Sequence, residues 1–128
     1  MTAEKTTQVE SVSFGSGGLT IAMSSEHWDV TVSFPQSYGF RVLNELDLTE
    51  FWSQCSLAQG WFFEVISGGW KDLEMTREHF YSGRPEWVRE YLLVGLNECV
   101  SVLTKEEPAF EVQVASNHSV KQRPDGAA

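Results

Sequence analysis

Gly60–Trp70 reads GWFFEVISGGW, and Glu90–Leu103 reads EYLLVGLNECVSVL. These are the densest apolar runs of the chain. Within the first run, Trp61–Ile66 is apolar at all but one position, which predicts a central strand covered on both faces. The second run predicts a hairpin whose strands are Tyr91–Val94 and Cys99–Leu103. We therefore place the centre of a sheet in this stretch.

Apolar and polar residues alternate with a period of two on both sides of these runs, which is typical of half-buried strands. Short polar turns between the first four strands predict an antiparallel meander with one solvated face. In the fourth strand, Phe40 and Val42 are expected to face the core. The last strand is expected at a sheet edge. The additional predicted strands are Val9–Phe14, Leu19–Met23, His27–Phe34, Tyr38–Leu43 and Phe110–Val114.

A helix is predicted over Leu48–Ala58, the best helical pattern in the chain. Asp47 and Glu50 have the spacing of a capping box, and Gly60 supplies a C-terminal stop. An apolar stripe at helical spacing would pack on the sheet. The stripe consists of Leu48, Phe51, Trp52 and Cys55.

Residues 70–81 fit two interpretations. The favoured one is a strand over Trp70–Thr76, because Gly68 and Gly69 between two aromatic runs are typical of a hairpin. The alternative is a helix over Asp72–Tyr81, on which Leu73 would lie on the apolar side.

These patterns together predict an α+β fold, a mostly antiparallel β-sheet of about seven to nine strands with one main helix packed on it. Residues 1–8 are expected to be a disordered N-terminus, 9–114 a single α+β domain, and 115–128 a disordered C-terminal tail. A chain of 128 residues buries enough surface to fold without disulfides or metals. Cys55 and Cys99 form no CxxC pair and are expected to be reduced thiols.

The net charge of −9 is concentrated in the expected domain, where residues 9–114 hold 16 of the 18 acidic and 6 of the 9 basic residues. Such a body repels phosphate backbones, which argues against a nucleic-acid partner, and it attracts a basic protein. The alternative is that the acidic residues only keep the protein soluble. No run has the roughly 18 apolar residues of a membrane span, and the N-terminus lacks the apolar region of a signal peptide. We therefore expect no membrane association and a cytoplasmic location.

The sequence offers few candidates for catalytic or metal-binding side chains. His27 and Asp29 share a strand face but lack a third metal ligand, so a solvated face is the favoured interpretation. Glu64 would have a raised pKa if buried among its apolar neighbours, and the alternative is an ion pair with Arg77 or Arg89. No nucleophile, phosphate-loop or metal motif is present. We therefore predict no catalytic residue, no metal, no cofactor and a protein that is not an enzyme.

Aromatic and acidic residues are interspersed through residues 70–90, a mixture that suits binding to a basic protein surface. The alternative is that Trp70 and Trp87 are core residues and the acids are merely solvated. The predicted partner-binding residues are Trp70, Asp72, Glu74, Glu78, Glu86, Trp87 and Glu90.

Gly60–Trp70 and Glu90–Val102, together with the preceding strands and helix, resemble small immunity proteins of bacterial polymorphic-toxin systems (contact-dependent or type VI secreted toxins). The resemblance spans roughly residues 28–103. It implies a protein that binds one cognate toxin domain and blocks it. The acidic body described above predicts that this toxin domain is basic, and we expect the protein itself to be a monomer or homodimer. The alternatives are a homodimeric structural subunit and a small-molecule-binding or enzymatic sheet domain. The latter would use an aromatic pocket of Trp28, Phe40, Trp61 and Phe63.

Overall fold

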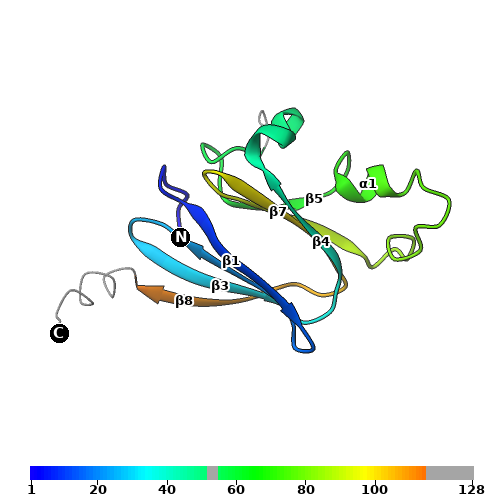
Figure 1. Ribbon diagram of the computed structural model, residues 1–128, viewed down its shortest axis with the longest axis horizontal. Coiled ribbons are helices and arrows are strands. Elements are labelled where there is room, and N and C mark those ends of the chain that lie inside the picture. The colour runs from blue at the N-terminus through cyan, green and yellow to red at the C-terminus, as the bar shows by residue number, and fades with distance from the viewer. Residues whose placement is uncertain (52–54, 115–128) are drawn as a thin grey trace.

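The computed structural model describes residues 1–51 and 55–114 (Figure 1). Within these residues the chain forms two four-stranded sheets in which all neighbouring strands are antiparallel. Sheet A has the order β1-β2-β3-β8, and sheet B has the order β4-β7-β6-β5. The elements are β1 (Gln8–Gly15), β2 (Gly18–Ser24), β3 (Trp28–Phe34), β4 (Ser37–Asn44), the 3-10 helix η1 (Glu45–Phe51), β5 (Phe62–Val65), α1 (Trp70–Glu74), β6 (Arg89–Val94), β7 (Glu98–Thr104) and β8 (Ala109–Val114).

The two sheets stack face to face and enclose the main core. Aromatic contacts fix how they are aligned. Phe14 of β1 lies 5.5 Å from Phe40 of β4, and Phe110 of β8 lies 5.2 Å from Phe62 of β5, both measured between ring centroids. Alternate residues of β2, β3, β6 and β7 fill the space between. The most buried of these are Leu19, Ile21, Met23, Val30, Val32, Phe34, Leu93, Val100 and Val102.

A second, smaller cluster covers the outer face of sheet B. Leu48 of η1 packs there on Leu92, Val94 and Cys99. Figure 1 shows η1 and α1 on the side of sheet B that faces away from sheet A. Because both faces of β6 and β7 are covered, each strand is buried at every position after its first residue rather than at alternate positions.

Most predicted strands are confirmed, including the β6–β7 hairpin and β8 at an edge. The four-stranded meander is wrong, since β4 pairs with β7 of the other sheet. Trp61–Ile66 was predicted to contain a central strand, but β5 is the edge of sheet B. Phe40 and Val42 do point to the inner side, opposite Val102 and Val100, yet Val42 is exposed because β4 is also an edge.

The predicted helix over Leu48–Ala58 differs from the structure. Glu45–Phe51 form a 3-10 helix that is interrupted at Leu48, whose backbone is not helical. Residues 55–59 form bends and turns, and residues 52–54 lie outside the described residues. The α-helix in the described part, α1, spans five residues. The chain is therefore mostly antiparallel sheet, and one main helix packed on it is not confirmed.

The N-terminal residues, expected to be disordered, contact both sheets. The carbonyl of Thr2 accepts a hydrogen bond from Nε1 of Trp28 at 2.8 Å, and that of Met1 accepts one from Nε1 of Trp61 at 3.0 Å. Thr7 is fully buried. Buried indoles need an acceptor for their N–H, and this segment supplies it. The predicted tail, residues 115–128, lies outside the described residues.

Candidate functional site

The predicted partner-binding residues lie on α1, on the loop that follows it, and at the start of β6. The favoured strand over Trp70–Thr76 is wrong, because this segment begins with α1. The carboxylate of Glu90 accounts for the helix found in place of the predicted strand. Oε2 of Glu90 accepts a hydrogen bond from the N–H of Trp70 at 2.9 Å, and Oε1 accepts one from the N–H of Lys71 at 2.7 Å. A helix leaves its first N–H groups without internal partners, and Glu90 binds two of them.

Glu90 is 4% exposed, so it is not available to a partner as predicted. Burial raises the pKa of its carboxyl, and the two N–H groups of α1 oppose that rise only in part. Gly69 allows the close approach. A Cβ there would lie 2.6 Å from Oε2 of Glu90 and 2.6 Å from Cγ1 of Val65. Glu90 therefore fixes α1 to sheet B, and Gly69 is the residue that fits between them.

Trp70 is half-buried and links α1 to β4. The guanidinium of Arg41 lies 5.2 Å from its ring centroid, and its Nε1 donates to Oε2 of Glu74 at 3.1 Å. Glu74 also accepts a hydrogen bond from Nε of Arg77 at 2.5 Å, and this bond is the main cause of the lowered pKa of Glu74. Trp70 and Glu74 are thus engaged within the protein, in line with the alternative in which Trp70 contributes to packing.

The other four predicted residues, Asp72, Glu78, Glu86 and Trp87, are exposed. Asp72 accepts a hydrogen bond from the N–H of Gly68 at 2.7 Å. Trp87 is 56% exposed, which rules out the alternative in which it is a core residue, and its Nε1 donates to the hydroxyl of Tyr38 at 3.2 Å. Trp87 is therefore held in place while most of its ring stays accessible.

Further large apolar side chains are exposed on this segment or in contact with it. They are Tyr38, Ile66, Leu73 and Tyr81, with Ile66 83% exposed. The sequence did not single them out as site residues, since Leu73 fits the favoured strand and the alternative helix equally well. They are identified by their exposure in the structure, on a segment that no other part of the described chain covers. We call residues 66–90 together with Tyr38 the α1 surface.

A cavity of about 360 Å³ and one of about 240 Å³ adjoin sheet B. The smaller one opens on the α1 surface and brings Asp72, Glu86 and Glu90 together with Glu64. It is also lined by Val65, Ile66, Ser67, Lys71, Val88 and Arg89. Glu64 is exposed and lies 4.0 Å from Nε of Arg89, so it forms the alternative ion pair and is not buried.

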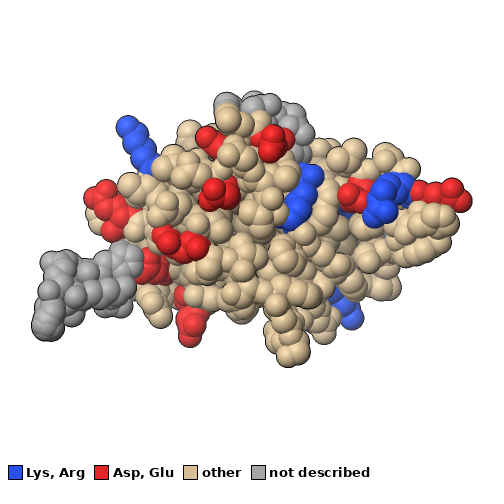
Figure 2. All heavy atoms as spheres, in the orientation of Figure 1, with Lys and Arg blue, Asp and Glu red and all other residues tan. Residues whose placement is uncertain are grey.

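The charge of the α1 surface is mixed rather than strongly acidic. Its carboxylates are accompanied by Lys71, Arg77, Arg84 and Arg89. In Figure 2, Lys and Arg atoms lie beside Asp and Glu atoms at the end of the molecule where Figure 1 places α1 and its loop, whereas Asp and Glu predominate at the opposite end. On the face shown, the negative charge therefore lies mostly away from the α1 surface, which is distinguished by exposed aromatic and apolar groups.

The alternative aromatic pocket does not form from the predicted residues. Trp28 and Trp61 are buried against each other with ring centroids 5.2 Å apart. Phe40 packs on Phe14, and Phe63 belongs to the cluster on the outer face of sheet B. A different cavity, of about 440 Å³, opens between the β8 and β5 edges. It is lined by Met1, Thr2, Ala3, Leu57, Ala58, Gln59, Gly60, Trp61, Phe62 and Phe110.

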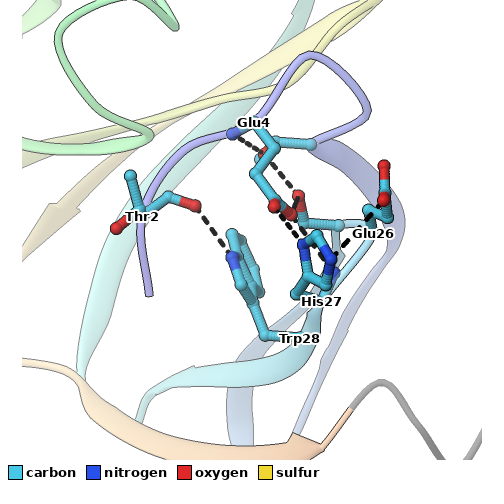
Figure 3. Close-up of polar contacts among 7 residues, drawn as sticks. Thr2, Glu4, Glu26, His27 and Trp28 are labelled. Atoms are coloured by element: carbon cyan, nitrogen blue, oxygen red, sulfur yellow. Dashed lines mark hydrogen bonds and ion pairs between the residues drawn. The ribbon is translucent and has the colours of Figure 1, made fainter.

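His27 has a different partner from the one considered in the sequence (Figure 3). It lies before β3, and its Nδ1 contacts the Glu4 carboxylate. Glu4 also accepts hydrogen bonds from the hydroxyl of Ser25 and the N–H of His27. These bonds, that of Ser25 most, lower the pKa of Glu4 to about 2, and the Glu4 bond raises the pKa of His27. The cluster attaches the N-terminal segment to the β2–β3 turn.

Within residues 1–51 and 55–114, no group of three or more His, Cys, Asp or Glu side chains is arranged to hold a metal ion. In the same part of the chain, no helix has the length and apolarity needed to span a bilayer. Comparison of the chain with protein-family models, with curated proteins and with solved structures gives no match.

Proposed function

We propose that this protein is an immunity protein that binds a cognate, basic toxin domain without covalent chemistry and neutralises it. The α1 surface is the proposed contact. The supporting observation is that Trp87, Tyr81, Ile66 and Leu73 are all more than half exposed on one short segment. Exposed apolar groups gathered in this way are typical of protein-binding surfaces, and Trp and Tyr are enriched among the residues that dominate binding energy.

In this proposal, net charge governs the association rate and aromatic contact governs the dissociation rate. The net charge of −9 attracts a basic partner over a distance set by ionic strength and speeds association. Trp87, fixed by its bond to Tyr38, then enters the partner surface and slows dissociation. Asp72, Glu78 and Glu86 surround the aromatic groups and pair with Lys or Arg of the toxin.

The experiment begins with the protein encoded beside this one. We expect co-expression of the pair to restore growth that the neighbour alone abolishes, and the two to co-elute in size exclusion. Replacing Trp87 by Ala should weaken the complex by about 2 kcal/mol, the loss typical of a hot-spot residue. Leu46 is exposed outside the α1 surface, so Leu46→Ala is the matched control and should change affinity by less than about 0.5 kcal/mol.

Charge is tested separately from aromatic contact. Glu86→Lys should lower the association rate and its dependence on salt while leaving the dissociation rate nearly unchanged, as expected of a charge at the rim of an interface. The absence of a complex with the neighbour would refute the function. A complex that forms equally well with Trp87→Ala would instead place the contact elsewhere on the protein.

A second candidate is a small-molecule-binding or enzymatic sheet domain, and the cavity of about 440 Å³ beside Trp61 favours it. A cavity of this size is within the range of small-molecule sites. An apolar dye that binds there should quench the fluorescence of Trp61, and Phe62→Ala should change its affinity. A dye that leaves the tryptophan emission unchanged would remove this candidate.

A further inference from the structure

The four edge strands of the two sheets differ in how regular they are. The register of β1 shifts between Val9 and Ser11, and that of β4 shifts between Ser37 and Gly39. β5 spans only four residues. Bulges and short strands are common means of preventing an edge from pairing with another chain. By contrast, β8 pairs with β3 over six consecutive residues without a shift. It is the regular edge of the described sheets.

The side chains of β8 form two different rows. Phe110 and Val112 pair with core residues of β3 and point to the inner side, yet they are 44% and 55% exposed. Glu111 lies between them in sequence and points to the opposite, outer side. An added strand that pairs with β8 would continue both rows. Its inner side chains would meet apolar groups, and its outer side chains would meet a carboxylate.

The inner row leads to the cavity of about 440 Å³ between the β8 and β5 edges. Phe110 is one wall of this cavity, and it contacts Phe62 and Trp61 at 5.2 and 6.2 Å between ring centroids. An apolar side chain of a strand on β8 can therefore enter a space that is already lined by aromatic rings. Main-chain hydrogen bonds supply affinity in strand addition, and pockets for alternate side chains supply specificity.

We propose that the outer edge of β8, which pairs with no further strand of the described residues, binds an extended segment of a partner protein in which apolar and basic residues alternate. The apolar residues lie over Phe110 and Val112, and a Lys or Arg lies beside Glu111. Glu106 precedes the strand and adds negative charge, whereas Glu107 forms an ion pair with Arg89 at 3.0 Å. A second copy of this chain would bring the same net charge of −9 to the edge, which opposes self-pairing. This site is independent of the α1 surface.

The probe is a ten-residue peptide in which Val and Lys alternate, titrated into the full chain. The control is the same peptide with N-methyl groups on alternate residues, which removes the main-chain donors of one edge. We expect the unmodified peptide to change tryptophan emission and to slow hydrogen exchange in residues 109–114. The methylated peptide should bind at least about tenfold more weakly, the loss expected from two or more hydrogen bonds.

Variants locate the binding. Glu111→Lys should weaken the unmodified peptide by about tenfold, because it opposes like charges across the strand pair. Glu86→Lys is the matched control on the α1 surface and should leave peptide binding unchanged, which separates this site from the proposed toxin contact. Equal binding of the two peptides, or no slowing of exchange in residues 109–114, would overturn the proposal. So would a concentration-dependent dimer that protects the same amides without peptide, since the occupant would then be a second copy.

Discussion

Replacing Glu90 by Ala tests whether α1, and with it the α1 surface, depends on one buried carboxylate. The change removes the acceptors of two backbone N–H groups, at 2.9 and 2.7 Å. A hydrogen bond to a charged group contributes about 1.5–3 kcal/mol net. Truncation also removes the cost of burying the carboxylate, which offsets part of this loss. We expect the free energy of unfolding to fall by about 2–3 kcal/mol.

Glu90→Gln separates shape from charge. Glutamine keeps one acceptor oxygen but directs an NH₂ group at the second N–H, so its loss should be about half that of the alanine variant. The pH dependence gives an independent check. The folded pKa of Glu90 is raised above its ordinary value of 4.5, so the stability that this group contributes is lost as pH rises through the folded pKa. Relative to Glu90→Gln, the wild type should therefore gain stability as pH falls from 7 toward 4.5.

The measurement is urea unfolding followed by tryptophan fluorescence at several pH values, with hydrogen exchange at the amides of Trp70 and Lys71. We expect exchange at these two amides to accelerate in both variants, because their acceptor is lost or weakened. Two results would refute the reasoning. One is a change of less than about 0.5 kcal/mol in Glu90→Ala, and the other is a difference between wild type and Glu90→Gln that grows as pH rises.

Two other changes test local structure. Gly69→Ala should lower stability by about 1–3 kcal/mol through overpacking against Glu90, whereas Gly17→Ala, which meets nothing within 4 Å, should be nearly neutral in the same urea titration. Glu4→Gln should destabilise the protein most between about pH 4.5 and 6.5. The lowered pKa of Glu4 contributes its full stability above about pH 4.5, and the raised pKa of His27 contributes its full stability below about pH 6.5. A difference between wild type and Glu4→Gln that does not vary with pH would show that the contact with His27 contributes nothing.

The strands were predictable because each carries its own signal. Leu19–Met23 and Trp28–Phe34 alternate, and the alternating residues are those that face the other sheet. The division into two sheets carries no such signal. Alternation shows which side of a strand is buried but not which strand lies beside it, so nothing in Tyr38–Leu43 distinguishes pairing with β3 from pairing with β7.

Local patterns predicted a long helix that the described residues do not form, and they favoured a strand where a short helix is present. A capping box and an apolar stripe predicted three helical turns after Asp47, yet the described residues form a 3-10 helix that is broken at Leu48. Gly68 and Gly69 predicted a hairpin, yet α1 begins at Trp70 because Glu90, twenty residues away, binds its first N–H groups. Helix propensity is a weak prior that tertiary contacts override, and this tertiary contact is a single side chain.

The same carboxylate explains why the site was only partly predictable. Composition alone brought Trp70, Trp87 and Glu90 into one group, because aromatic and acidic residues are interspersed between them. Burial then separates them by role. Glu90 binds the start of α1, Trp70 packs under Arg41, and Trp87 remains exposed. Residue type alone does not distinguish a side chain that holds a surface in place from one that contacts a partner. The Glu90 variants and Trp87→Ala distinguish these roles, because the former should change stability and the latter only binding.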